Sequence, residues 1–438
     1  MERRKATACT AALVLRLIAC ARADEACNTA AKAVTSPLRM GVNLGGLFVL
    51  EDWFFSTPGR GQGDGNHVAT DTPGAAIGRP YLLDPDLAGV RTWSSESDFL
   101  QSVPADVAMR AMTRHRDSYI LPEVLFAKLE AIEKLASQRN IRVDRLRLPI
   151  PWALNLGAEE IRVIGPGGRE VGLLPHQQSE WIIQDPYHSN VSWTGLPEWR
   201  LAAWIDGAAR SGRTVLLDVH TWVGGSSEGT FNGIYPLQPR FWTDLPLARR
   251  NLRVVFEGLV AWCVAHPDGL YGITPMNEPA HLHGIADLGF EPPPVPAVLD
   301  VLSEAIEIFR AKAADSGLRL IMNIIETAFN ESSYQAQFEA ANGYRPSSVL
   351  DAIGSWWKSV TTPAERASWA VLDVHHYVAW DGLDVCANAT VETLSVEAAG
   401  KQLREYSGGA SWYKRLRDEL GLEADSQIAV RGTYCCWS

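Results

Sequence analysis

The chain alternates amphipathic stretches with short apolar ones from about residue 40 to residue 430. In the amphipathic stretches, apolar residues recur every three or four positions, the period of a helix with one buried face. The apolar stretches are rich in Val, Ile and Leu, a composition typical of strands that are buried on both faces of a parallel sheet. Strands are expected at 39–50, 141–150, 214–219, 271–275, 318–325, 369–374 and 427–430.

Helices are expected in the passages between these strands. Pro122 stands at the start of one such helix, where a proline needs no hydrogen bond. A regular alternation of helix and strand, with no break in the sequence, predicts one α/β domain of the (β/α)8 TIM barrel type. The expected helices cover 121–140, 198–211, 251–265, 298–316 and 402–420, with a further helix entering the strand at 369–374; in the second, Trp199, Leu201, Trp204 and Ile205 form the expected apolar side.

Polar residues stand at the carboxyl ends of the expected strands. In a parallel barrel these ends share one rim, so residues that are scattered in sequence would converge there. A lone Arg in such a place also suits a structural salt bridge, and that alternative stays open for Arg147 unless other site residues meet it. The candidate site residues are Asn43, Arg147, His220, Asn277, Glu278, Glu326, His375 and Tyr377.

The stretch Y-G-I-T-P-M-N-E-P, from Tyr271 to Pro279, predicts a strand that presents a carboxylate at this rim. Pro279 would stop the strand, because proline cannot donate to a ladder. Asn277 is suited to hydrogen-bond a sugar hydroxyl, and a partly desolvated Glu278 would keep its proton near neutral pH. The pattern is short, and a plain strand end capped by Pro is its structural alternative.

Composition narrows the class of partner. The net charge of −11 argues against nucleic acid and against anionic membranes, which favour basic surfaces. Sixteen Trp residues favour a carbohydrate partner, because aromatic faces stack on sugar rings, although burial in the core explains most of them equally well. His281, His283, His375 and His376 lack the spacing of a metal motif, so neither a metal nor a cofactor is expected.

The first 23 residues have the layout of a secretory signal peptide, with a basic start, an apolar run and the small-residue site Ala21-Arg22-Ala23. Residues 24–438 would then form the mature, single-domain protein. Sequons at Asn190, Asn330 and Asn388 fit a secreted glycoprotein. No later apolar run reaches the ~20 residues that span a bilayer, so a soluble, extracellular protein is expected. It is also expected to be a monomer.

Five cysteines follow the signal peptide, and an odd number leaves at least one thiol unpaired. Secretion would allow one or two disulfides, with Cys263 to Cys386 as the preferred pair. Cys435 and Cys436 are not expected to bond to each other, because neighbouring cysteines form a strained loop.

The chain resembles glycoside hydrolase family 5, and within it the exo-β-1,3-glucanase-like branch. The resemblance runs in order over nearly the whole mature chain, with each motif at an expected strand end. The matching stretches are G-V-N-L-G-G-L-F-V-L-E at Gly41, R-L-P-I-P-W at Arg147, L-L-D-V-H at Leu216, N-E-P at Asn277, I-I-E-T-A-F at Ile324 and V-L-D-V-H-H-Y at Val371.

The resemblance implies a retaining glycosidase that cleaves β-linked glucan, with β-1,3-glucan as the expected substrate. Glu278 would be the general acid/base, and Asn277 would contact the sugar 2-hydroxyl. Arg147 and His220 would order the carboxylates and the bound sugar, while His375 and Tyr377 would lie beside the nucleophile. Retaining enzymes use two carboxyl groups roughly 5 Å apart and pass through a covalent glycosyl-enzyme intermediate.

The sequence departs from the family pattern at its C-terminal end, where it reads R-G-T-Y-C-C-W-S after Val430. The family pattern places a nucleophilic Glu directly after strand seven, followed by an eighth strand. The barrel is therefore expected to be truncated in or after strand seven. Three explanations remain open: a sequence record whose end was mis-joined, a real truncated product without hydrolase activity, and replacement of the nucleophile by Glu326. A non-catalytic glucan-binding relative is the alternative function.

Overall fold

A computed structural model represents the protein. The residues that it describes are 38–50, 95–136, 141–157, 161–175, 181–227, 232, 234, 237–279, 291, 293–325, 336, 339–340, 349–375, 417–418, 420–423 and 426–431.

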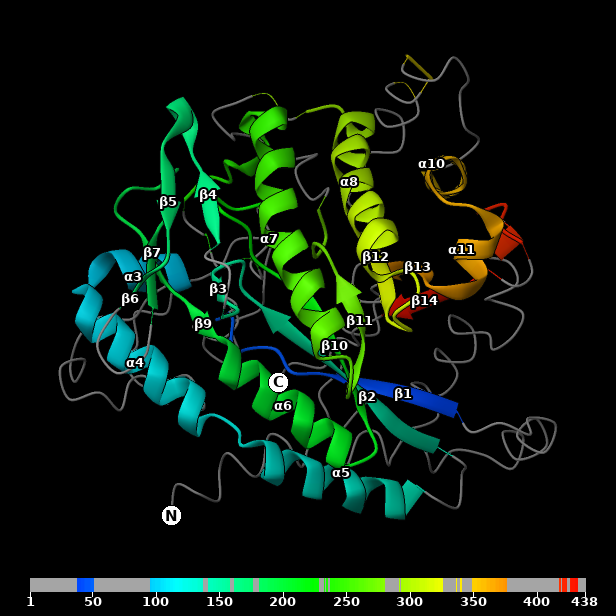
Figure 1. Ribbon diagram of the computed structural model, residues 1–438, viewed down its shortest axis with the longest axis horizontal. Coiled ribbons are helices and arrows are strands. Elements are labelled where there is room, and N and C mark those ends of the chain that lie inside the picture. Colours follow the sequence, from blue (N-terminus) through cyan, green and yellow to red (C-terminus); the bar gives the residue numbers. More distant parts are fainter. Residues whose placement is uncertain are drawn as a thin grey trace, which may run out of the picture.

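A seven-stranded sheet forms the centre of the fold, and all its pairs are parallel (Figure 1). The strands lie in the sheet in the same order as in the chain, so the strand order never reverses. A sheet wound in one direction is the arrangement of an α/β barrel, whereas doubly wound sheets reverse their order at a switch point. In order, the strands are β1 (Leu38–Asn43), β2 (Ile141–Ile150), β10 (Thr214–Val219), β11 (Leu270–Thr274), β12 (Arg319–Ile325), β13 (Ala370–His375) and β14 (Ile428–Arg431).

The fold is therefore a barrel-like α/β fold, as the sequence predicted at that level. β1 and β14 are the outer strands of the described sheet. The predicted truncation falls on residues after Arg431, which lie outside the described part of the chain. The same holds for any strand that would close a (β/α)8 barrel there.

Helices fill the passages between successive strands of the sheet from β1 to β13. Several begin with a side-chain cap: Ser95 accepts from the Asp98 amide at 3.1 Å, and Asp244 accepts from the Leu247 amide at 3.0 Å. Such caps satisfy amides that have no partner within the helix. The helices are α3 (Glu96–Ser102), α4 (Ala105–Ser118), α5 (Pro122–Ala136), α6 (Glu198–Arg210), α7 (Leu245–Ala265), α8 (Val295–Ala313), α10 (Val349–Val360) and α11 (Pro363–Ser368).

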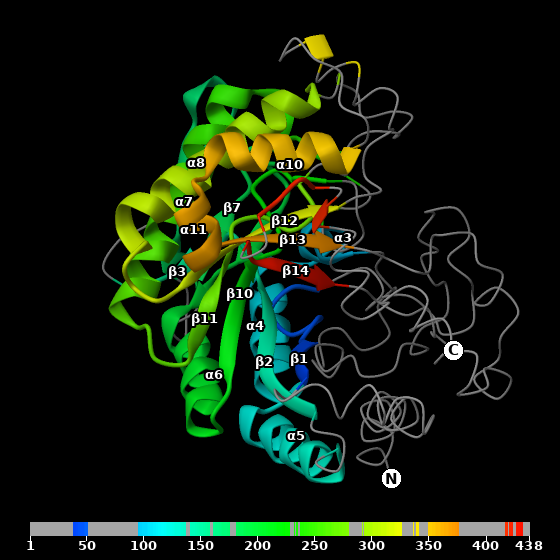
Figure 2. The ribbon, with the colours of Figure 1, turned by 90° about the vertical axis from the view of Figure 1, so that its right-hand side faces the viewer.

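The two faces of the sheet have separate apolar clusters. Leu217, Leu320 and Leu372 belong to the large core that the sheet shares with the helices. Figure 2 shows α6, α7, α8 and α11 on one side of the strands, which we call the outer face. Leu216, Ile321 and Val371 form a second cluster, and alternation along a strand places them on the opposite, inner face. The inner face is therefore available for the site.

A long insertion with its own small sheets occupies the passage from β2 to α6. Asp185, which is fully buried, ties this insertion to the loop after β10. Its carboxylate accepts from the Trp193 indole at 2.9 Å and from the Gly224 amide at 3.0 Å. The insertion contains β3 (Leu154–Asn155) with β9 (Leu196–Pro197), β4 (Arg162–Ile164) with β5 (Glu170–Gly172), β6 (Leu174–Pro175) with β7 (Trp181–Gln184) and β8 (Ser192–Thr194), and the 3-10 helix η5 (Pro166–Gly168). A second 3-10 helix, η8 (Phe241–Thr243), lies between β10 and α7.

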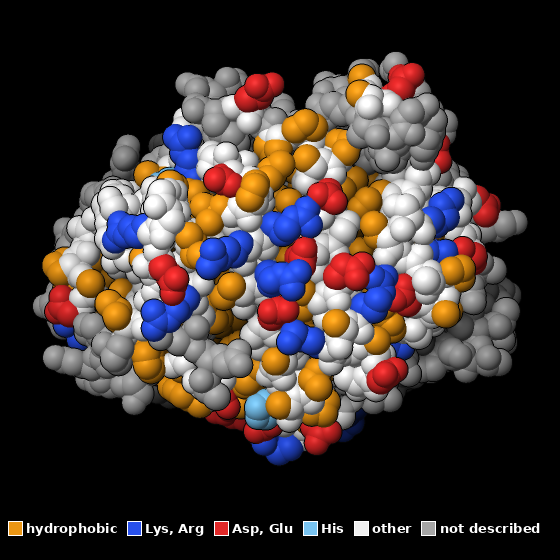
Figure 3. All heavy atoms as spheres, turned by 45° about the horizontal axis from the view of Figure 1, so that its top comes forward, with side chains coloured by type: hydrophobic (Ala, Val, Ile, Leu, Met, Phe, Trp, Pro, Cys, Tyr) orange, Lys and Arg blue, Asp and Glu red, His pale blue; other side chains and the backbone are white. Residues whose placement is uncertain are grey.

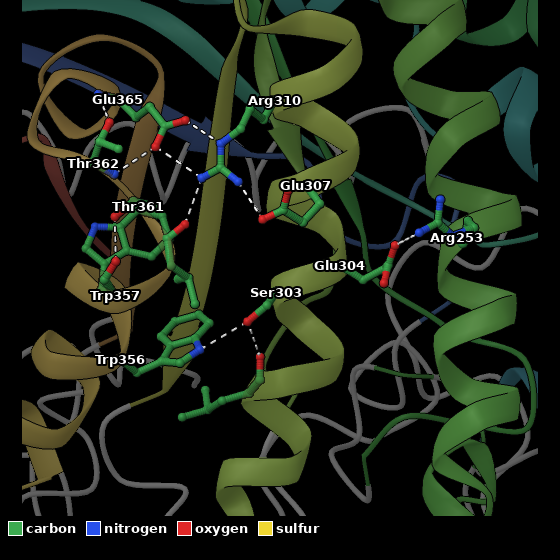
Figure 4. Close-up of polar contacts among 12 residues, drawn as sticks. Arg253, Ser303, Glu304, Glu307, Arg310, Trp356, Trp357, Thr361, Thr362 and Glu365 are labelled. Atoms are coloured by element: carbon green, nitrogen blue, oxygen red, sulfur yellow. Dashed lines mark hydrogen bonds and ion pairs between the residues drawn. The ribbon is translucent and has the colours of Figure 1, made fainter. Parts of the chain in front are cut away.

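Polar contacts join the outer helices to one another (Figure 4). Arg310 of α8 donates to Glu365 of α11 at 2.5 Å and to the Val360 carbonyl at 2.8 Å. Glu365 also completes a capping box with Thr362 at the start of α11. These contacts fix the helix layer that supports β12 and β13.

Some sequence predictions about local structure were wrong. The strand expected at 39–50 ends at Asn43, and the chain then turns through Gly46, whose φ of 74° favours glycine. The strand before the N-E-P motif ends at Thr274, because Pro275 has no N–H to continue the ladder. Trp199 is 52% exposed rather than part of the apolar side of α6.

The preferred disulfide was also wrong. Cys263 is a free thiol, fully buried on the packed side of α7, and Cys386 lies outside the described residues. Burial raises the pKa of the Cys263 thiol, so this side chain behaves as a small apolar group.

The surface carries charges of both signs. Figure 3 shows basic and acidic side chains interspersed among apolar ones on the face turned to the viewer. Within the part of the chain that the structure describes, no helix is both long enough and apolar enough to cross a membrane. Most of the described Trp side chains are buried in the core, so burial explains them without a carbohydrate partner.

Two glycines give opposite predictions for stability. A Cβ added to Gly272 in β11 would collide with the Arg319 carbonyl of β12, so Gly272→Ala should lower the free energy of unfolding by roughly 1–3 kcal/mol. Gly258 in α7 has open space around it, and Gly258→Ala should raise the free energy by up to about 1 kcal/mol. Urea unfolding measures both, and equal effects of the two changes would contradict the close approach of β11 and β12.

Candidate functional site

Arg147 of β2 joins polar side chains from the carboxyl ends of three other strands, β1, β10 and β11. Its Nη2 lies 2.8 Å from Asp218 Oδ2 on β10 and donates to Asn277 Oδ1 after β11 at 2.5 Å. Its Nη1 donates to Asn43 Oδ1 at the end of β1, at 3.3 Å. The sequence left open a purely structural ion pair for Arg147; the structure shows an ion pair and also the convergence that a functional site requires.

His220 is held by the same carboxylate. Its Nδ1 donates to Asp218 Oδ2 at 2.6 Å, and its backbone amide donates to the Ile150 carbonyl at 2.9 Å. Asp218 is fully buried and His220 is 3% exposed, so their contact is shielded from water. A carboxylate that accepts from Nδ1 fixes both the tautomer and the orientation of the ring.

Glu278 lies in an unusual backbone conformation beside this cluster. Its φ is +42°, the only positive φ of a non-glycine residue in the described part of the chain. The Glu278 amide donates to Asn323 Oδ1 of β12 at 2.7 Å, and the Asn277 amide donates to the Val219 carbonyl at 3.1 Å. Strained residues persist when their surroundings hold them in place, and they cluster at functional sites. Glu278 is 3% exposed, which agrees with the expected desolvation.

Five of the eight predicted site residues can be placed together: Asn43, Arg147, His220, Asn277 and Glu278. His375 is the last residue of β13 and pairs in register with Arg431, so its backbone stands at the same edge of the sheet. Glu326 and Tyr377 lie outside the described residues, as do His281, His283 and His376. Among the side chains that the structure does describe, no group of His, Cys, Asp or Glu is arranged to hold a metal ion.

Two residues outside the predicted set organise the site. Asp218 is the shared acceptor of Arg147 and His220, and Asn323 holds the Glu278 amide. A signal was present, because each is a polar residue inside an otherwise apolar strand. Asp218 also stands two positions before His220, which places the two side chains on the same face of the chain.

Helices α3 and α4 hold the segment that follows Asn43 at the end of β1. Glu96 Oε2 accepts from the Leu50 amide at 2.8 Å, and His115 Nε2 contacts the Gly46 carbonyl at 2.7 Å. Both contacts lie within seven residues of Asn43 and fix the segment that follows β1. Arg116 donates to the Gly195 carbonyl at 2.9 Å, so the same helices also hold the insertion after β2.

Burial changes the protonation of these supporting groups. Burial raises the pKa of Glu96 to about 7, although the Leu50 amide and the Arg116 charge oppose this shift. Burial lowers the pKa of His115 to about 4, so the ring is neutral at physiological pH.

Comparison with protein-family models and with curated proteins gives no match. Among solved structures, the chain is similar to PbGH5A, a glycoside hydrolase family 5 enzyme from Prevotella bryantii B14, at 12% identity, over 91% of this chain and 76% of that chain, with a TM-score of 0.39. It is also similar to an endocellulase from Pyrococcus horikoshii in complex with cellotetraose, at 14% identity, over 71% of this chain and 68% of that chain, with a TM-score of 0.36. TM-scores this low carry no weight for fold or function. The fold therefore rests on strand order and register alone.

The buried Arg147–Asp218 pair leads to a prediction about stability. Asp218→Asn would keep the shape of the side chain but leave the Arg147 guanidinium, whose side chain is 12% exposed, without its counter-charge. Loss of one partner of a buried pair costs roughly 3 kcal/mol or more of unfolding free energy, which urea unfolding measures. Asp106→Asn breaks an exposed pair with Arg110 on α4 and should cause no measurable loss. Equal stability of the two variants would contradict a dry Arg147–Asp218 contact.

Glu96 leads to a prediction about pH. Its folded pKa of about 7 lies above the ordinary 4.5, so its contribution to stability is full below pH 4.5 and declines as pH rises through 7. The unfolding free energy of the wild type, measured relative to Glu96→Gln, should fall by up to roughly 3 kcal/mol across that window and then level off. Taking this difference cancels the opposite contribution of His115. A difference independent of pH would show that Glu96 is not buried as described.

Proposed function

We propose that the protein is a glycoside hydrolase that cleaves β-linked glucan with retention of configuration, with Glu278 as general acid/base. The observation that carries the proposal is the convergence of the Arg147, Asp218, His220 and Asn277 side chains at the carboxyl edge of the sheet, where the buried and strained Glu278 directly follows Asn277. The ordered motifs of the sequence, which resemble glycoside hydrolase family 5, add independent support.

The hydrogen bonds suit recognition of a neutral, hydroxylated ligand. Because Asn277 Oδ1 accepts from Arg147, the Asn277 amide group presents its NH2 as a donor, which suits a sugar hydroxyl oxygen. The positive charge of Arg147 is compensated by Asp218, so the site does not select an anionic substrate. This pattern favours positioning of a sugar over binding of a phosphate at this edge.

Glu278 has the role that the chemistry requires of an acid. Its backbone is held from two sides, through the Asn323 side chain and the bond from Asn277 to Val219, so the direction of its side chain is restricted. A carboxylic acid in that place would protonate the glycosidic oxygen as the leaving group departs, and would later deprotonate the attacking water. A second carboxylate has to serve as nucleophile. The family pattern places it after strand seven, where the sequence has no such Glu. Glu326, whose substitution for it is one of the three open explanations, lies outside the described residues.

The finer parts of the proposal rest on the sequence resemblance. They are the preference for β-1,3-glucan, secretion after cleavage near residue 23, glycosylation and a monomeric state. Asn190 is exposed in the turn between β7 and β8, which suits a glycosylation site, although its amide nitrogen donates to Gln101 at 2.7 Å.

Glucan binding without hydrolysis is the second candidate. The groups that would hold a sugar, Arg147, Asn277 and His220, need no nucleophile to do so. The two functions separate in one experiment, because a binding protein retains oligosaccharide affinity without releasing sugar.

Glu278→Gln is the central test. With laminari- and cello-oligosaccharides as substrates, the variant of the full chain should lose at least roughly a hundredfold in kcat/KM, because an amide cannot donate the proton. Oligosaccharide affinity should change little, since Asn277 and Arg147 remain in place. Glu257→Gln on α7, which alters only a surface contact with Arg253, is the matched control and should retain full turnover.

Three results would decide between the candidates. Turnover that survives Glu278→Gln would remove this residue from the role of acid/base. Oligosaccharide binding by a wild type that releases no sugar would favour the binding protein. Absence of both binding and turnover would reject a glucan-directed function.

A further inference from the structure

Two arginines share one aromatic ring at the opposite end of the inner face. The Arg145 guanidinium carbon lies 3.8 Å from the centre of the Tyr271 ring, and that of Arg319 lies 5.5 Å from it. Arg319 is the first residue of β12, and Arg145 is level in register with Thr214, the first residue of β10. These residues therefore stand at the amino-terminal end of the sheet.

This cluster is separated from the candidate site. Tyr271 packs against Leu216, Ile321 and Val371, the apolar cluster of the inner face. Along β10 and β12, these apolar residues stand between the amino end and the polar residues of the site, such as Asp218. The arginine pair therefore has no part in the proposed glycosidase chemistry, and an inference drawn from it does not depend on that proposal.

The charges of this pair are not neutralised by any carboxylate of the described residues. Arg319 donates through Nε to Gln427 Oε1 at 3.0 Å, a neutral partner. Among the described residues, the one contact of the Arg145 guanidinium group is with the Tyr271 ring. Several other half-buried or buried arginines of the described residues do have carboxylate partners: Arg147 with Asp218, Arg213 with Glu133, Arg310 with Glu365 and Arg366 with Glu423.

Two like charges in this setting repel each other while they are partly removed from water. Arg145, Tyr271 and Arg319 are all half-buried, so the cations have lost part of their hydration. The face of a tyrosine ring offsets some of this cost, but it carries no net charge. The chain as a whole has a net charge of −11, yet the described residues supply no acid here. A bound anion would offset both the repulsion and the lost hydration.

We propose that Arg145 and Arg319 form a binding site for a tetrahedral oxyanion, phosphate or sulfate, at the amino-terminal end of the sheet. Guanidinium groups bind phosphate with two parallel hydrogen bonds, and two of them match an anion of about two negative charges. With respect to the described residues, Arg145 offers all its side-chain N–H groups, and Arg319 offers those of its two terminal nitrogens. The Tyr271 ring contacts both guanidinium groups and so restricts where each can lie.

Calorimetric titration of the full chain with inorganic phosphate, in a chloride buffer of constant ionic strength, tests the proposal. We expect saturable binding at one site at millimolar or lower phosphate. Arg145→Gln and Arg319→Gln should each raise the dissociation constant by roughly tenfold or more, because each removes a charge-assisted contact. Arg110→Gln on α4 also removes one positive charge, but from an exposed surface pair, and should bind as the wild type does.

A second set of titrations identifies the source of the anion. Glucose 6-phosphate that binds at least as tightly as phosphate would assign the site to phosphorylated sugars, and weaker binding would assign it to the free ion. Glucose alone, and acetate with its single charge, should bind weakly or not at all. Tighter binding of acetate than of phosphate would reject the tetrahedral dianion.

Two results would overturn the site. The first is absence of saturable binding to the wild type, and the second is equal binding by the wild type and both Gln variants. If a Gln variant fails to fold, Arg145→Lys and Arg319→Lys keep the charge but lose the planar fork. They should bind phosphate more weakly than the wild type, and unchanged binding by both would also reject the proposal.

Discussion

The ion pair of Arg147 and Asp218 is the contact on which the arrangement of the site depends. Asp218 is fully buried, and its Oδ2 is within hydrogen-bond distance of both Arg147 Nη2 and His220 Nδ1. A charge taken out of water is tolerated only when it is paired, so neither partner can turn away. Because Arg147 also bonds Asn43 and Asn277, this one requirement orders the ends of four strands.

The remaining architecture makes such a buried pair possible. A sheet wound in one direction places the helices on its outer face, so the inner face can carry polar residues above an apolar layer. Helices α3 and α4 then hold the segment after β1 through Glu96 and His115, two titratable groups whose pKa values burial shifts in favour of the neutral form. The strained backbone of Glu278 persists because Asn323 reaches across from β12.

Local sequence predicted the elements well where one physical signal dominated. β10 matches its predicted range of 214–219, because a short, mainly apolar run that follows a helix and ends in polar residues is typical of a buried strand. The prediction failed at 44–50, where an equally apolar run forms turns rather than strand, since Gly46 allows a left-handed backbone and the core accepts apolar loops. Trp199 was wrongly predicted to be buried, because helical periodicity identifies the apolar side of a helix but not where that side ends. Cys263 was wrongly predicted to form a disulfide, because its burial in α7 is decided by tertiary packing.

The sequence by itself determined the alternation of helix and strand, the singly wound parallel sheet and most of the residues at its carboxyl edge, because periodicity and strand ends are local properties. Only the tertiary structure showed that Asp218 is the shared partner of Arg147 and His220, and that Asn323 holds the Glu278 amide. Only it brought Arg145 and Arg319 onto one tyrosine ring. The physical reason is the same in each case: these contacts join residues from different strands, and strand register, rather than sequence separation, decides which side chains meet.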